Sequence, residues 1–144
     1  MFGNDFSRSD KNNPINAELN YGYSVLLSSI SREIVSNGCL TQLGVHHDNM
    51  FNGFNLASDI MEPFRPFFDQ HVLSLPHIEL DKETKHSLVN VLNRKIIFDK
   101  KEQYVLNALS IYVKSVLDAA DSDNIDLIKY PDYELSLHEG NCNV

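Results

Sequence analysis

The residues best suited to chemistry lie in one short stretch, from His46 to Arg65. Asp59 and Glu62 are three residues apart, so a helix would place both carboxylates on one face, with Arg65 within reach of Glu62. Two carboxylates this close repel each other unless a cation lies beside them. Hard divalent cations bind carboxylate oxygens, and a histidine nitrogen such as that of His47 shifts the preference from calcium toward manganese-like metals. The spacing therefore indicates half of a divalent-metal site.

Two plainer interpretations of the same stretch stay open. Asp59, Glu62 and Arg65 would also form a solvated charged face with one ion pair, and the two neighbouring histidines would form a surface pair in a glycine-bounded loop. Two prolines favour the metal site, since they would fix the backbone just after Glu62. Other acidic and histidine residues are expected to be exposed and without a role, namely Glu18, Glu33, His71, His77 and His86.

The elements that must position these residues are predicted to be helices. Pro14 suits the first position of a helix, and apolar residues then recur at helical spacing until Gly38 ends the run. Residues 39–54 lack a clean period and are expected to form a loop. A second helix is predicted over about residues 56–75, capped by Asn55 and bent by its two prolines.

The second half of the chain also shows helical patterns. Asp81 is predicted to cap a third helix, and the segment from Asp99 to Glu102 resembles a capping box that opens a fourth. The fourth helix would place four apolar residues on one face, Val105, Leu109, Tyr112 and Val116. With almost no strand pattern, the sequence predicts an all-α fold. We expect a compact bundle of about four to seven helices, with a long proline-bent helix and an irregular acidic tail.

The composition is that of one globular domain. The chain has 144 residues, of which 42% are hydrophobic and 10% aromatic, too few for two ordinary domains. We predict a helical catalytic-type domain over residues 1–120 and an acidic C-terminal tail over residues 121–144. The net charge of −8 argues at first against a nucleic-acid partner. However, the segment from Asp118 to Glu139 holds −6 of that charge, so the rest of the chain is nearly neutral.

The sequence favours the cytoplasm and no membrane association. No run of the chain approaches the roughly 18 apolar residues of a membrane span, and its first residues do not resemble a secretory signal. Cys39 and Cys142 have no second cysteine or histidine ligand at close spacing. That spacing excludes a disulfide scaffold and a zinc ribbon, and it fits a reducing compartment.

Three motifs resemble those of one known family. They are Asn-Pro-Ile-Asn-Ala-Glu-Leu-Asn-Tyr-Gly-Tyr-Ser (13–24), Leu-Gly-Val-His-His (43–47) and Asn-Leu-Ala-Ser-Asp-Ile-Met-Glu-Pro-Phe-Arg-Pro (55–66). In this order and spacing they are similar to the helical C-terminal domain of the CRISPR-associated spacer-acquisition integrase, the Cas one family, in the version that accompanies type II systems. The resemblance covers roughly residues 1–120.

The resemblance implies a metal-dependent DNA endonuclease and integrase that inserts new spacers into the CRISPR array in antiviral defence. In the family a glutamate, a histidine and a later acidic residue hold Mg²⁺ or Mn²⁺. By motif the histidine falls on His47 and the later acid on Glu62, with Asp59 as a supporting or alternative ligand. The implied partners are double-stranded DNA, a small partner subunit and, for the intact protein, a second copy in a homodimer. From spacing alone, Arg65 is expected to fix Glu62 or to touch a DNA phosphate.

The resemblance also implies an incomplete site. The family's first glutamate belongs to a Glu-Gly-x-Ala-Ala motif that does not occur in this sequence, and Glu18 lies in a different motif. We therefore expect a fragment without the family's β-rich N-terminal domain, weak metal binding, and little or no nuclease activity from the chain alone. Two alternatives remain: a non-catalytic helical module that holds protein or DNA, and a metal-dependent hydrolase of a small substrate.

Overall fold

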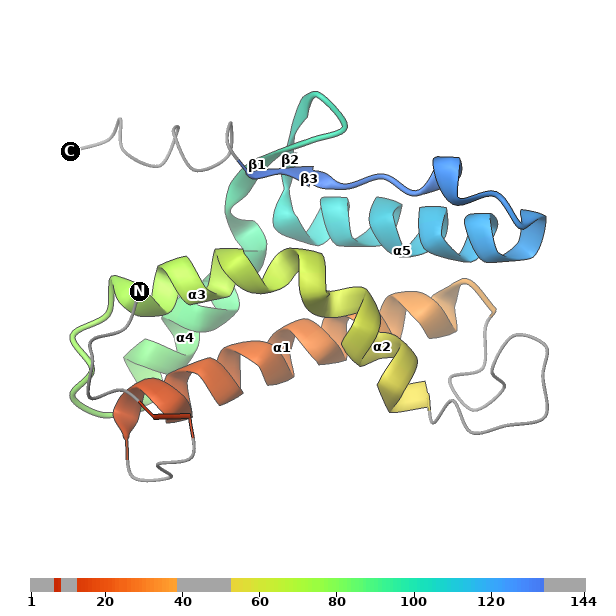
Figure 1. The fold of residues 1–144 in the computed structure, drawn as a ribbon. Coiled ribbons are helices and arrows are strands. Elements are labelled where there is room, and N and C mark those ends of the chain that lie inside the picture. Colours follow the sequence, from red (N-terminus) through yellow and green to blue (C-terminus); the bar gives the residue numbers. More distant parts are fainter. Residues whose placement is uncertain (1–6, 9–12, 39–52, 134–144) are drawn as a thin grey trace.

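The computed structural model describes residues 7–8, 13–38 and 53–133, the side chains of residues 53–55 excepted. In chain order its elements are α1 (Pro14–Ser36), α2 (Gly53–Met61), the 3₁₀ turn η1 (Glu62–Phe64), α3 (Arg65–Leu73), α4 (Lys82–Asn90), the 3₁₀ turn η2 (Val91–Asn93), β1 (Lys95–Phe98), β2 (Lys101–Tyr104), α5 (Val105–Ser122), the 3₁₀ turn η3 (Ile125–Leu127) and β3 (Pro131–Asp132). In the view of Figure 1, α2 and α3 run between α1 on one side and α5 with the strands on the other.

Helix α1 is the element around which the other described helices pack. The side chain of Asn13 accepts a hydrogen bond from the Ile15 backbone nitrogen at 3.0 Å, which caps the first turn. Beyond the last turn, Gly38 has a φ of 78°, a conformation that glycine adopts without steric cost. Between these ends α1 contacts α2, α3, α4 and α5. The first predicted helix is confirmed.

Gly22 lets α1 approach two of these helices closely. A Cβ atom at this position would lie 3.0 Å from Cδ1 of Phe68 on α3 and 3.6 Å from Cδ2 of Leu88 on α4. Phe68 and Leu88 are fully buried, so neither has free space into which to retreat. The glycine is therefore part of the packing that fixes α3 against α1.

The predicted proline-bent helix is present as two helices with a break between them. Pro63 lies in the first positions of η1, and Pro66 lies in the first positions of α3, where a missing backbone donor is tolerated. The break is therefore sharper than a bend. The first of these helices begins at Gly53, so the predicted cap at Asn55 is wrong. Three fully buried phenylalanines anchor the break in the core, Phe64, Phe67 and Phe68.

The expectation of an all-α fold is wrong, because the described residues include a three-stranded antiparallel sheet of order β2-β1-β3. The segment that resembled a capping box is the turn of a hairpin, in which Phe98 pairs with Lys101. Asp99 and Lys100 both have positive φ values, 50° and 64°, as a two-residue type I′ turn requires. Strand β1 buries Ile96 and Phe98 on one face, so the sheet belongs to the core. The helix that follows begins at Val105.

The first part of the expected irregular tail also has regular structure. After α5 and η3, strand β3 pairs with β1, with Pro131 opposite Phe98 and Asp132 opposite Ile97. The Lys129 Nζ atom lies 2.7 Å from Asp99 Oδ2 on the hairpin turn. The acidic residues beyond Tyr133 lie outside the described residues, and the division of the chain at residue 120 stays a prediction. None of the helices in the described ranges is long and apolar enough to cross a membrane.

Candidate metal and DNA site

Glu62 is the first residue of η1, at the break between α2 and α3. The turns before it bury their apolar side chains, Ala57, Ile60 and Met61. Because these residues face the core, Asp59 and Glu62 are left on the exposed side, and the Glu62 side chain is 58% exposed. The structure thus places both predicted acids at the surface of one bend. His46 and His47 lie outside the described residues.

Arg65 lies against Glu62, as the spacing predicted. Its Nη1 atom donates to Glu62 Oε1 at 2.6 Å, and the Arg65 side chain is 36% exposed. The ion pair crosses from the first residue of η1 to the first residue of α3, so it ties the two sides of the break together. The predicted ion pair is confirmed, whereas the DNA contact of Arg65 stays a prediction.

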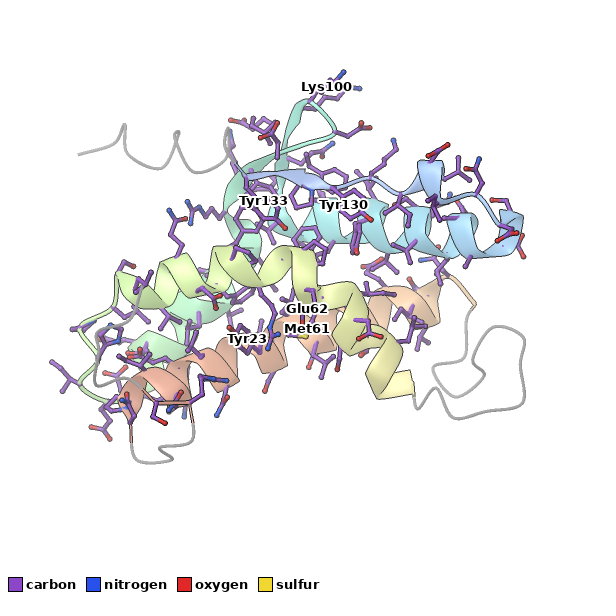
Figure 2. All side chains as sticks on the ribbon, viewed as in Figure 1. Tyr23, Met61, Glu62, Lys100, Tyr130 and Tyr133 are labelled. Atoms are coloured by element: carbon purple, nitrogen blue, oxygen red, sulfur yellow. The ribbon has the colours of Figure 1, made fainter. Side chains whose placement is uncertain are left out.

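Two further residues from different elements belong to this arrangement. The Cζ atom of Arg65 lies 4.4 Å from the centre of the Tyr23 ring on α1, within the range of a cation–π contact. The Tyr23 hydroxyl donates a hydrogen bond to Oδ1 of Asp69 on α3. Burial, together with this hydrogen bond, raises the pKa of Tyr23 to about 12. Figure 2 shows Tyr23 on α1 beside the bend that carries Met61 and Glu62.

Neither Tyr23 nor Asp69 was among the residues predicted for the site. Tyr23 and Asp69 are 46 residues apart in the chain, so no local spacing connects them. The available signal was a tyrosine inside a motif of the resembled family together with an acidic residue one turn after Arg65. That signal does not predict that the tyrosine and the acid contact each other.

A comparison with protein families assigns the chain. The family model described as "CRISPR associated protein Cas1" matches residues 6–107, which is more than half of the sequence. The chain belongs to the Cas1 family. The matched range contains all the predicted site residues, His47, Asp59, Glu62 and Arg65.

Curated Cas1 relatives match most of this chain. The CRISPR-associated endonuclease Cas1 of Neisseria meningitidis serogroup C (strain 8013) is 34% identical over 137 residues, which cover 92% of this chain and 45% of the relative. The CRISPR-associated endonuclease Cas1 1 of Saccharolobus solfataricus is 30% identical over 111 residues, covering 76% of this chain and 30% of the relative. The chain thus spans less than half the length of these two relatives.

A solved structure has the same arrangement of elements. A casposase bound to integration product superimposes with a TM-score of 0.64 at 25% sequence identity. The superposition covers 88% of this chain and 42% of the casposase. The fold described above is therefore the fold of part of that larger protein.

This Cas1-family chain also buries an acid that was expected to be exposed. Glu18 on α1 is 1% exposed, and its Oε2 lies 2.6 Å from Nδ1 of His77 in the loop between α3 and α4. His77, the partner of Glu18, has a φ of 55° and therefore lies at a strained backbone position. Glu18 and His77 are 59 residues apart, which is why sequence spacing gave no indication of the pair.

A groove beside α4 gathers basic side chains. It has a volume of about 660 Å³ and is lined by residues that include His71, Lys82, His86 and Arg94. Burial lowers the pKa of Arg94, and burial and then the nearby Arg94 charge lower the pKa of His71. The His71 Nε2 atom lies 2.7 Å from the Ser87 hydroxyl oxygen. The acid Glu83 also lines the groove, so its charged lining holds two bases, Lys82 and Arg94, and one acid.

The described part of the chain holds no group of three or more His, Cys, Asp or Glu side chains placed to bind a metal ion. Asp59 and Glu62 are both exposed carboxylates, which are the ligands that Mg²⁺ and Mn²⁺ prefer. The donor chemistry at the bend therefore fits a hard divalent cation, although two carboxylates alone would not complete a site for one.

Proposed function

We propose that the chain forms the helical part of a metal-dependent DNA endonuclease and integrase that inserts new spacers into a CRISPR array. The observation that supports this most directly is the Cas1-family match over residues 6–107, which contain the exposed acids at the α2–α3 break. We assign His47 and Glu62 as ligands of Mg²⁺ or Mn²⁺, with Asp59 as a supporting ligand. The casposase structure, bound to integration product, supports DNA as the substrate class.

The bend provides what a ligand for such an ion needs. When bound, a divalent cation lowers the pKa of an attacking hydroxyl and neutralises the charge that develops on phosphate oxygens. Glu62 offers one carboxylate oxygen, Oε2, while Arg65 holds the other, Oε1, at 2.6 Å. The buried phenylalanines of η1 and α3 keep the backbone under both residues rigid. The chain's residues thus orient the Glu62 carboxylate through one of its oxygens.

DNA contact is assigned to basic side chains that do not read sequence. Arg65 lies next to Glu62, and Lys82 and Arg94 line the groove beside α4. Contacts of this kind neutralise phosphates and release counterions, so binding weakens steeply as salt rises. The acidic C-terminal segment carries most of the net charge of −8, so the rest of the chain, which holds these basic residues, is nearly neutral.

The remaining assignments follow from the family. We propose that the whole protein acts in the cytoplasm as a homodimer with a small partner subunit. The 144 residues contain no Glu-Gly-x-Ala-Ala motif, which carries a further ligand in the family. We therefore propose that this chain, on its own, cleaves branched DNA little or not at all.

Two substrates presented with Mn²⁺, branched duplex DNA and a small phosphoester, distinguish the hypotheses. We expect the purified chain to bind branched duplex DNA in a salt-dependent way, to cleave it barely, and not to hydrolyse a small phosphoester. Turnover of the small phosphoester without DNA binding would favour the small-substrate hydrolase. DNA binding that is indifferent to metal and to Glu62→Ala would favour the non-catalytic module. Robust cleavage of branched DNA would contradict the proposed need for a further ligand.

A further inference from the structure

Glu62 is connected to α1 through a continuous line of side-chain contacts. Asp69 accepts a hydrogen bond from the Tyr23 hydroxyl, the Tyr23 ring lies under the Arg65 guanidinium, and Arg65 donates to Glu62. The line starts on α3, crosses to α1, returns to α3 and ends on η1. It therefore spans the break at which the helix direction changes.

The Arg65 guanidinium has few other anchors. Its Nε atom is buried, and among the described residues it has no hydrogen-bond partner. The position of the group then depends on the Tyr23 ring, 4.4 Å from Cζ, and on the Glu62 carboxylate. A second guanidinium, that of Arg8, lies 5.8 Å from the centre of the same ring. Arg8 is held by the side-chain oxygens of Asn16 and Asn20, so of these two cations it is Arg65 that Tyr23 connects to Glu62.

Asp69 in turn fixes the Tyr23 ring. A tyrosine ring without a partner for its hydroxyl would be free to tilt, and a tilted ring would no longer offer its face to Arg65. The raised pKa of Tyr23, about 12, keeps the hydroxyl protonated as a donor at all ordinary pH values. Tyr23 is half-buried, which limits the competition of water for its hydroxyl.

We propose that Tyr23 and Asp69 are positioning residues for Glu62, acting through Arg65. Asp69 orients the ring, the ring holds the guanidinium, and the guanidinium binds Oε1 of Glu62, which leaves Oε2 for another ligand. The consequence for metal binding rests on the proposed function, in which Glu62 is a ligand. The positioning itself is a property of the chain without metal.

The plain alternative is that Tyr23 only packs between α1 and α3. If Tyr23 only packs, its removal destabilises the fold, and any change in the surroundings of the Glu62 carboxylate is the same with and without Arg65. Positioning predicts that the effect on Glu62 passes through Arg65 and disappears when Arg65 has already been removed. A double-mutant cycle separates the two.

The first measurement follows the Glu62 side-chain carboxyl ¹³C resonance, identified by its absence in Glu62→Gln. We expect Tyr23→Leu to shift this resonance, and Asp69→Asn and Tyr23→Phe to shift it less, because the phenylalanine ring keeps its face under Arg65. In an Arg65→Met background, Tyr23→Leu should leave the resonance unmoved. Tyr104→Leu, at an exposed tyrosine on β2, is the control.

The second measurement is Mn²⁺ affinity, read from the electron paramagnetic resonance signal of free Mn²⁺. Removal of residues that orient a metal ligand commonly weakens binding by about 10-fold to 100-fold. We expect a loss of about 10-fold for Tyr23→Leu, a smaller one for Tyr23→Phe, and none added by Tyr23→Leu in the Arg65→Met background.

Each result decides something different. Equal effects of Tyr23→Leu with and without Arg65, or no effect on the Glu62 resonance in a folded Tyr23→Leu chain, would overturn the positioning. If Tyr23→Leu does not fold, the same comparison is made with Tyr23→Phe and Asp69→Asn. A parent chain that binds no Mn²⁺ would contradict the proposed function, while the resonance would still test the positioning.

Discussion

At the scale of single residues, the ion pair between Glu62 and Arg65 contributes little to the stability of the fold. The pair is substantially exposed, and exposed ion pairs typically contribute only about 0–1 kcal/mol to folding. A backbone break with two prolines and three buried phenylalanines would hold without the pair. In the proposed site, the pair supplies a fixed orientation for one carboxylate. That is a requirement of binding rather than of folding.

The site residues show what a sequence reveals at this scale. The Glu62–Arg65 pair was predictable, because residues three apart at a helical position meet by geometry. The roles of Tyr23 and Asp69 were not, since their contact depends on how α1 crosses α3. The burial of Glu18 was missed for the same reason, its partner His77 being held by a distant loop.

The tyrosines predict alkaline sensitivity. The pKa of Tyr23 and that of Tyr112 are raised to about 12 from an ordinary value of 10.0, in both cases first by burial. The folded state therefore holds protons that the unfolded state releases, so stability is full below pH 10 and falls as pH rises toward 12. Urea unfolding at steps from pH 9 to 11 should show the fall, and Tyr23→Phe should make it shallower. An identical pH dependence in the parent and the variant would contradict this.

At the scale of elements, the residues of the hairpin turn led to a wrong prediction, whereas the two prolines led to a correct one. The two prolines predicted the interruption between α2 and α3, because a missing backbone donor acts locally. The hairpin was missed because its strands are only four residues long and β2 is highly charged. Asp99 suits a positive φ, but Lys100 is an unusual residue for one, so the turn carried no asparagine-glycine or aspartate-glycine signal.

The hairpin turn gives a prediction at this scale. Lys100→Gly should raise the free energy of unfolding by about 0.5 kcal/mol, because glycine adopts a φ of 64° without the steric cost that lysine bears. Lys101→Gly is the matched control: it removes the same charge next door, but from extended strand β2. It should lower stability by about 0.5–1 kcal/mol. Chemical denaturation measures both, and equal effects of the two substitutions would contradict the assigned turn.

At the scale of the whole molecule, the segment after α5 closes the fold. Tyr133 stacks on Phe67 with ring centres 5.6 Å apart, and its hydroxyl donates to the Pro63 carbonyl. Lys129 and β3 attach the same segment to the hairpin. In Figure 2, Tyr133 lies between the sheet and the α2–α3 arm. The acidic charge of this region concealed its packing, since the apolar residues are too few to form a period.

Tyr133 therefore predicts a stability effect far from the candidate site in sequence. Tyr133→Ala should lower the free energy of unfolding by about 2 kcal/mol, because it removes a half-buried ring and a hydrogen bond. Tyr104→Ala, at an exposed tyrosine, should cost less than half as much. Urea unfolding compares them. Equal losses would show that the segment after α5 contributes no packing of its own.

At this scale too, the chain corresponds to only part of each of its relatives. It spans less than half of the two Cas1 relatives compared above, so their activities belong to longer proteins. The mainly helical arrangement was recognisable from sequence, because three motifs of the family occur in this chain in the expected order and spacing. The small sheet was not recognisable, and neither were the contacts that Tyr23 makes with Arg65 and Asp69 beside Glu62.

The central claim is that His47 and Glu62 bind a divalent cation, and thermal unfolding with Mn²⁺ tests it most directly. A ligand at ten times its dissociation constant stabilises the folded state by about 1.4 kcal/mol, or about 3 °C or more in a chain of this size. We predict such a rise for the parent chain, its loss in His47→Ala and in Glu62→Ala, and its retention in Asp121→Ala, an exposed acid at the end of α5. No rise in the parent, or the same rise in all four proteins, would contradict the account.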